Sequence, residues 1–155
     1  MSFLNTINII GSGLTAQQLR LDIVSENVTN SQTTRTENGG GAYRRKMVVF
    51  QAKDGRDSFR AAMARAANGL VPNSQVNPNA GGVQVTQIVE DESPMKLVYD
   101  PTHPDANEDG YVELPNVDMV MEIADAMAAS RAFASNVTAF NTVKSVIASG
   151  LEIGR

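Results

Sequence analysis

The chain has 155 residues, 42% of them hydrophobic, which suffices for one modest domain with a core and is too short for two ordinary ones. Its formal net charge is -4, from 13 basic and 17 acidic residues, and its only dense basic run is Arg44, Arg45 and Lys46. This balance lacks the basic footprint of a nucleic-acid-binding protein. The chain has no cysteine, which excludes disulfides, thiol nucleophiles and thiolate metal sites.

The N-terminus, MSFLNTINIIGSGLTAQ, has neither the basic start nor the continuous apolar core of a Sec signal peptide. No stretch reaches the ~20 apolar residues that span a bilayer. We therefore expect no transmembrane segment and, if the protein leaves the cytoplasm, export without a cleaved signal peptide. Only 5% of the residues are aromatic and none is tryptophan, so we expect the isolated monomer to be modestly stable.

Residues 1–30 predict an N-terminal assembly helix. Ser2 is a suitable N-cap, and a polar run that begins at Asn30 ends the helix. Apolar residues recur in alternating steps of four and three, with Gln17 as the one polar member, which is typical of a coiled-coil seam. We expect this seam to form an assembly surface made of Phe3, Ile7, Ile10, Leu14, Leu21, Val24 and Val28.

Residues 31–115 predict a middle, β-rich module. Alternating or short apolar runs indicate strands at 43–50, 83–89, 96–99 and 111–114. Between the first two lies an insert, near 53–80, in which SFRAAMARAANG favours a short helix and the following Pro, Asn and Gly residues favour a loop. We expect this insert to be the most mobile part of the chain.

Residues 116–155 predict a C-terminal assembly helix. Pro115 and Asn116 mark its start, with Asn116 as the N-cap and Asp118 in the first turn, where the helix dipole favours an anion. The predicted fold class is α+β, in which long terminal helices form a coiled-coil-like pair with a small β-rich module and loops between them. The expected assembly residues of this helix are Met119, Ile123, Phe133, Val137, Phe140 and Ile147.

The flanks of the first helix carry little charge. Arg20, Asp22 and Glu26 are its charged residues, and Gly11 and Gly13 each cost roughly 1 kcal/mol relative to alanine. Something outside the helix must therefore stabilise it. A helical hairpin within one globular domain stays open as an explanation, but the uncharged flanks favour packing against other copies.

The sequence SGLTAQQLRLDIVSENVTN, at 12–30, resembles the N-terminal signature of flagellar axial proteins. YRRKMVVFQ at 43–51, PMKLVYDPTHPDANEDGYVELPNVD at 94–118 and ASRAFASNVTAFNTVKS at 129–145 are similar to the proximal rod proteins of the FlgC type. Residues 53–80 fit that pattern less well. The positions that carry the resemblance are Gly13, Leu14, Ala16, Gln17, Arg20, Leu21, Asp22, Asn27, Asn30, Pro115, Asn116, Val117 and Asp118.

The resemblance implies a structural subunit of the proximal rod of the bacterial flagellar basal body. Such a subunit is exported unfolded by the flagellar type III apparatus and polymerises in the periplasm, with copies of itself and other rod proteins, into a hollow helical shaft that transmits torque. The resemblance implies no enzymatic activity, no cofactor and no small-molecule substrate. Another axial protein, of the distal rod or hook type, stays open as an alternative, although those usually have a larger middle domain.

The loop DANEDG, at 105–110, matches the first half of an EF-hand calcium loop. Position twelve of that loop is Asn116 instead of a bidentate glutamate, and the upstream prolines Pro101 and Pro104 exclude the helix that an EF-hand requires. We predict a polar turn in which Asp, Asn and Gly are favoured, and no metal ligand. A secreted binding module with a calcium-stabilised loop stays open as a second alternative.

His103 is the one histidine, and it lies in the same proline-flanked loop near Asp100 and Asp105. A catalytic Ser-His-Asp arrangement would have to form around a flexible base. We therefore expect no catalytic residue.

Overall fold

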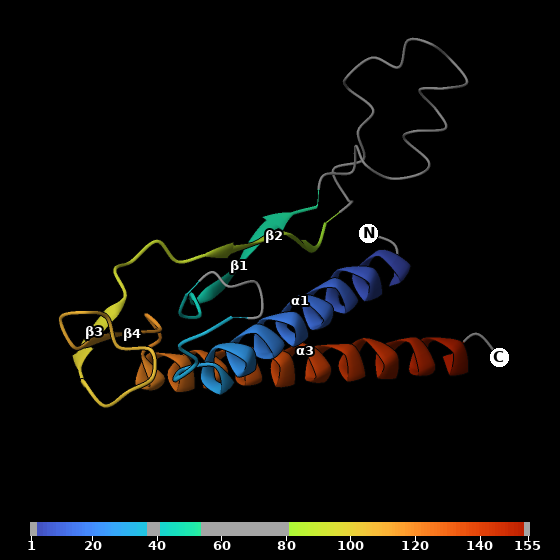
Figure 1. The fold of residues 1–155 in the computed structure, drawn as a ribbon. Helices are drawn as coiled ribbons and strands as arrows, with labels where there is room; N and C mark the ends of the chain where they lie inside the picture. Colours follow the sequence, from blue (N-terminus) through green and yellow to red (C-terminus); the bar gives the residue numbers. More distant parts are fainter. Residues whose placement is uncertain (1–2, 37–40, 54–80, 154–155) are drawn as a thin grey trace, which may run out of the picture. The chain divides into compact units, whose positions relative to one another are not determined.

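The computed structural model describes residues 3–36, 41–53 and 81–153. In chain order the elements are α1 (Phe3–Thr29), β1 (Lys46–Ala52), β2 (Val83–Glu90), β3 (Lys96–Tyr99), β4 (Tyr111–Leu114) and α3 (Met119–Ile153), as Figure 1 shows. A long helix at each end with pairs of strands between them confirms the predicted α+β class. The short helix predicted at 58–69, and most of the 53–80 insert, lie outside the described residues.

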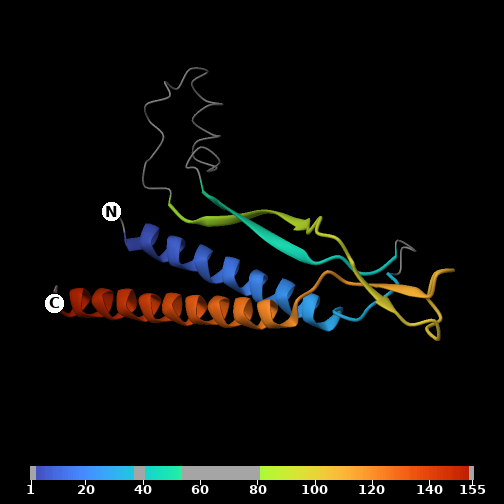
Figure 2. The ribbon, with the colours of Figure 1, turned by 90° about the vertical axis from the view of Figure 1, so that its left-hand side faces the viewer.

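The chain divides into two compact units. Unit 1 comprises Met1–Gln17, Phe50–Thr86 and Ala132–Arg155, and unit 2 comprises Gln18–Val49 and Gln87–Arg131. Each unit therefore contains one part of α1 and one part of α3. In unit 2 the last turns of α1 lie beside the first turns of α3, as the views in Figures 1 and 2 agree.

The two helices are long for a chain of this size. α1 has 27 residues and α3 has 35, which at 1.5 Å per residue gives about 40 Å and about 52 Å. α1 ends as predicted near Asn30, whose backbone N–H donates to Glu26 O at 3.0 Å and whose side-chain Nδ2 donates to the same oxygen at 3.0 Å. Within the described residues, neither helix combines the length and apolarity needed to cross a membrane.

The predicted N-cap of α3 is wrong. Asp118 caps the helix, because its Oδ1 accepts the backbone N–H of Val120 at 2.9 Å. The side chain of Asn116 is used elsewhere: its Oδ1 accepts Arg45 N at 2.9 Å, and its Nδ2 donates to Asp91 O at 3.1 Å. Both residue types are good caps, so long-range hydrogen bonds decide which one serves.

The four strands form two separate pairs, β1 with β2 and β3 with β4. At one end of the first pair Lys53 N donates to Gly82 O at 2.8 Å, and at the other Asp91 N donates to Arg45 O at 2.8 Å, so the pair is antiparallel. Three of the predicted strands are confirmed. The strand predicted at 43–50 is β1, and it begins at Lys46 instead of Tyr43. Tyr43 lies before the strand because its backbone N–H donates to Thr33 O at 3.0 Å in the loop after α1.

The β3–β4 pair is an antiparallel hairpin in unit 2, whose register runs from Lys96 opposite Leu114 to Tyr99 opposite Tyr111. In its connecting loop Asn107 Oδ1 accepts the backbone N–H groups of Asp109 at 3.2 Å and Tyr111 at 2.8 Å. Gly110 has a φ of 80°, a left-handed conformation that favours glycine. These contacts confirm the polar turn predicted for DANEDG.

Candidate assembly surface

Asn27, one of the positions that carry the family resemblance, lies at the centre of a buried polar cluster in unit 2. Its side chain is 1% exposed. Its Oδ1 accepts Lys46 N and Tyr43 Oη, each at 2.9 Å. Its Nδ2 donates to Lys46 O at 2.9 Å and to Glu122 Oε2 at 3.0 Å. Asn27 thus binds the start of β1 as a neighbouring strand would and holds it against α1 and α3.

Glu122 is the acidic member of this cluster, and it is 0% exposed. Its Oε1 accepts Arg45 Nε at 2.7 Å, and Arg45 Nη1 lies 3.5 Å from Asp91 Oδ2. Burial opposes the charged guanidinium, but the hydrogen bonds and charges of Glu122 and Asp91 together outweigh it, so the pKa of Arg45 is raised. Burial, reinforced by the charges of Glu26 and Glu122, raises the pKa of Tyr43, which keeps its hydroxyl a neutral donor to Asn27.

A second pair of contacts ties α1 to its neighbours in unit 2. Arg20 forms an ion pair with Asp125 of α3, with Arg20 Nε 3.2 Å from Asp125 Oδ2. Lys46 Nζ lies 2.5 Å from Glu26 Oε1. Arg20 and Asn27 of the N-terminal signature therefore both contact the first turns of α3, which explains why the signature combines a cation and an amide at this spacing.

In unit 1 the contacts between the helices involve small residues. A Cβ added at Gly13 would lie 3.0 Å from Asn136 Nδ2, so the glycine permits a close approach of α1 to α3 within this unit. Ser12 Oγ donates to Ile9 O at 2.7 Å and accepts the backbone N–H of Val83 at 3.0 Å, which attaches the start of β2 to α1.

The predicted assembly residues differ in burial. In α1, Val24 is buried, and Ile7, Ile10, Leu14, Leu21 and Val28 are half-buried; the side chain of Phe3 lies outside the described part. In α3, Phe133 and Ile147 are half-buried, whereas Met119, Ile123, Val137 and Phe140 are exposed. The chain by itself therefore leaves the larger part of the α3 seam uncovered.

The stretch of α3 in unit 2 is apolar on its outward side. Two of its charged residues, Glu122 and Asp125, are bound to α1 or to the loop before β1, and the third, Arg131, lies exposed at its end. Large side chains elsewhere on this stretch are exposed, among them Val120 at 76% and Met127 at 52%. A contiguous group of large apolar side chains that is exposed in a single chain is a candidate contact surface.

Sequence reasoning missed Glu122, Arg45, Tyr43 and Asp125. A coiled-coil seam is recognised from the spacing of its apolar residues, so this pattern does not identify a buried acidic residue that has a specific partner. A signal was present, since Glu122, Asp125 and Ala129 follow the same three-four spacing as a seam, and Ala129 is 0% exposed. The run Arg44, Arg45 and Lys46 supplies a partner cation for this face.

The loop with His103 holds ordinary structural contacts. His103 Nδ1 accepts the backbone N–H of Asp105 at 3.1 Å. Asp105 Oδ2 accepts Thr34 Oγ1 at 2.7 Å, and this bond, with the charge of Arg35 and His103, lowers the pKa of Asp105. Across the three described ranges, no group of at least three His, Asp or Glu side chains is arranged to hold a metal ion.

Two family models match the chain at its two ends. "Flagella basal body rod protein" matches residues 7–35, and "Flagellar basal body rod FlgEFG protein C-terminal" matches residues 108–153. The chain is 44% identical to the flagellar basal-body rod protein FlgC of Bacillus subtilis, over 100% of both chains. It is 40% identical to FlgC of Borreliella burgdorferi, over 99% of this chain and 98% of the relative. It is 38% identical to FlgC of Escherichia coli O6:H1, over 100% of both.

Proposed function

Because the chain belongs to the FlgC family of flagellar basal-body rod proteins, we propose that it is a structural subunit of the proximal rod. Its terminal helices polymerise into a hollow helical shaft that transmits motor torque, and it acts mechanically, without turnover or cofactor. The observation that carries this proposal is the outward side of α3 in unit 2, which is apolar and uncovered in a single chain.

The buried cluster in unit 2 prepares that surface for assembly. Asn27, Glu122 and Arg45 fix the first turns of α3 against α1, so the apolar side chains on the opposite side of α3 are held outward. Burying each large apolar side chain contributes roughly 1.5–3 kcal/mol. Several of them in one contact, repeated in every subunit, offset the cost of ordering the chain in a polymer.

We extend the proposal to the residues that make subunit contacts. In α1 they are Phe3, Ile7, Ile10, Leu14, Leu21, Val24 and Val28, and in α3 they are Met119, Ile123, Phe133, Val137, Phe140 and Ile147. The division into assembly segments at 1–30 and 116–155 and a middle module at 31–115 belongs to the same proposal. Half-burial of most α1 members leaves part of each side chain available to a neighbour.

The proposed route and partners follow from membership of a rod. The subunit passes through the flagellar type III export apparatus and assembles in the periplasm with copies of itself and with other rod proteins. The chain has no cysteine, and its described core consists mainly of small and medium side chains. These properties are compatible with threading through a narrow channel, because neither crosslinks nor a large core resists unfolding.

The test is the fate of the chain in its own bacterium. Deletion of its gene should abolish rods and swimming, and the restored chain should be present in isolated basal bodies. A Met127→Asp chain should be secreted but absent from them, because the substitution places a charge on the apolar side of α3. Basal bodies with complete rods in cells that lack the chain would overturn the proposal.

A further inference from the structure

The outer face of the β3–β4 hairpin is a second exposed apolar surface in unit 2. Successive side chains of a strand point to opposite faces, and Val112 on one face is buried. The other face, which we call the hairpin face, contains Leu97 at 63% exposure, Tyr99 at 65%, Tyr111 and Glu113. The rings of Tyr99 and Tyr111 meet edge to face at 5.3 Å between centroids, which fixes a preformed aromatic platform.

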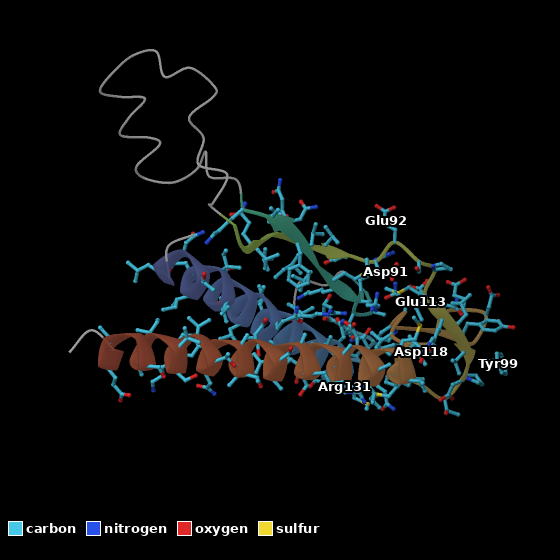
Figure 3. All side chains as sticks on the ribbon, turned by 180° about the vertical axis from the view of Figure 1, so that it is seen from behind. Asp91, Glu92, Tyr99, Glu113, Asp118 and Arg131 are labelled. Carbon is cyan, nitrogen blue, oxygen red and sulfur yellow. The ribbon has the colours of Figure 1, made fainter. Side chains whose placement is uncertain are left out.

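A face of α3 in the same unit matches it in chemistry. This α3 outer face contains Val120, Ile123 and Met127, which recur at steps of three and four, followed one turn later by Arg131. Each face thus has three large apolar side chains and one charge, and the charges are opposite, Glu113 on the hairpin and Arg131 on the helix (Figure 3).

The spacings of the two faces also agree. Met127 and Arg131 are separated by four helical residues, about 6 Å along the axis. Tyr111 and Glu113 are separated by two residues along β4, about 6.7 Å. When Tyr111 lies on Met127, Glu113 therefore reaches Arg131, and Leu97, opposite Glu113 in the register, lies beside them.

We propose that the hairpin face of one copy of this chain docks on the α3 outer face of the next copy, with Glu113 paired to Arg131. The inference rests on the proposed rod function and adds a specific contact to it. Because the two surfaces differ, the contact is heterologous, and repetition of such a contact builds a ring or an open helix instead of a two-fold dimer. The faces are small, so this contact sets subunit order within a polymer and does not hold two isolated chains together.

The experiment is photo-crosslinking in assembled rods, with p-benzoylphenylalanine in place of Leu97. Basal bodies are isolated after irradiation, and the crosslinked peptides are mapped by mass spectrometry. The expected product joins two copies of this chain, from position 97 of one to the stretch between Met127 and Arg131 of the other. The matched control places the same probe at Val98, on the opposite face of the same strand, and should not give this product.

Charge reversal tests the ion pair in the same assay. Glu113→Arg and Arg131→Glu should each lower the yield of the crosslink about fivefold or more, and the double reversal should restore it. A crosslink from position 97 to a different protein, to another part of this chain, or to nothing would overturn the inference while the chain is still found in basal bodies. Absence of the chain from basal bodies would instead overturn the proposed function.

Discussion

Glu122 contributes to stability through its hydrogen bonds to two neighbouring side chains. Its carboxylate is fully buried and binds both Asn27 and Arg45. Glu122→Ala should lower the free energy of unfolding by about 3 kcal/mol, because it removes the nearest acidic partner of the half-buried Arg45 guanidinium and one of the two acceptors of the buried Asn27 amide. Urea denaturation of the purified chain measures this effect.

The matched comparison is Glu92→Ala, a substitution at an exposed glutamate in the segment after β2 (Figure 3). It should change stability by less than about 0.5 kcal/mol, since surface substitutions away from special contacts are nearly neutral. Equal effects at the two positions would show that the buried cluster contributes nothing beyond a surface charge.

Asp105 should make stability depend on acidity. Its hydrogen bond to Thr34, with the charges of Arg35 and His103, lowers its pKa in the folded chain below the unfolded value of about 3.9. A lowered pKa contributes stability that is present above that value and is lost as the pH falls through the folded pKa. Asp105→Asn should therefore melt lower than the parent chain at pH 7, with a difference that shrinks below about pH 4.

Thermal melts at pH 7 and pH 3 test this dependence. Asp109→Asn, at an exposed position of the same loop, is the control, and it should leave the difference between the two pH values unchanged. A gap between Asp105→Asn and the parent chain that is as large at pH 3 as at pH 7 would refute a role for ionised Asp105.

At the scale of elements, two glycines of α1 offer a matched pair. A Cβ at Gly11 would meet no atom within 4 Å, whereas one at Gly13 would lie 3.0 Å from Asn136 Nδ2. Gly11→Ala should raise the free energy of unfolding by about 1 kcal/mol through helix propensity alone. Gly13→Ala should gain less or lose stability, because the side chain of Asn136 must move. Denaturation of both variants measures the contrast, and equal gains would exclude a close approach at Gly13.

The elements show what the sequence could predict. Periodicity located both helices and all the described strands, because burial of one apolar stripe is a local requirement that leaves a local pattern. It missed the first residues of α3 and β1, since Asn116 and Tyr43 bond to distant backbone groups. It also missed Glu122 and Arg45, because a buried ion pair is recognisable only when both partners are placed in space.

The residue types of the N-terminal family motif are restricted for a different reason than those of the seam. Its members Arg20 and Asn27 make directional bonds to α3 and β1, and directional bonds restrict residue type strongly. The seam members on α3 only need to be apolar, so the sequence could not separate Phe133, which the chain half-buries, from Phe140, which it leaves exposed.

For the whole molecule, the isolated chain should be unevenly ordered. The first turns of α3 are bound to α1 by the cluster around Glu122, whereas Val146 and Leu151 near its end are exposed. In hydrogen exchange on the dilute monomer, amides at 119–131 should be slow and amides at 137–153 fast, with both slow in assembled rods. Strong protection of both stretches in a confirmed monomer would favour a closed helical hairpin over helices that are ordered by assembly.

The proposed assembly through the terminal helices predicts the effect of an added charge. Leu21→Asp and Phe140→Asp should each block rod formation while leaving secretion intact, because an unpaired buried charge costs several kcal/mol and recurs in every subunit. Phe140 is 37% exposed in the single chain, so its substitution should disturb the monomer less than that of half-buried Leu21. Asn141→Asp, at the exposed polar neighbour, is the control for added charge and should swim normally. Secretion assays and swimming plates distinguish the steps, and normal swimming in the Leu21 or Phe140 variant would exclude that residue from the subunit interface.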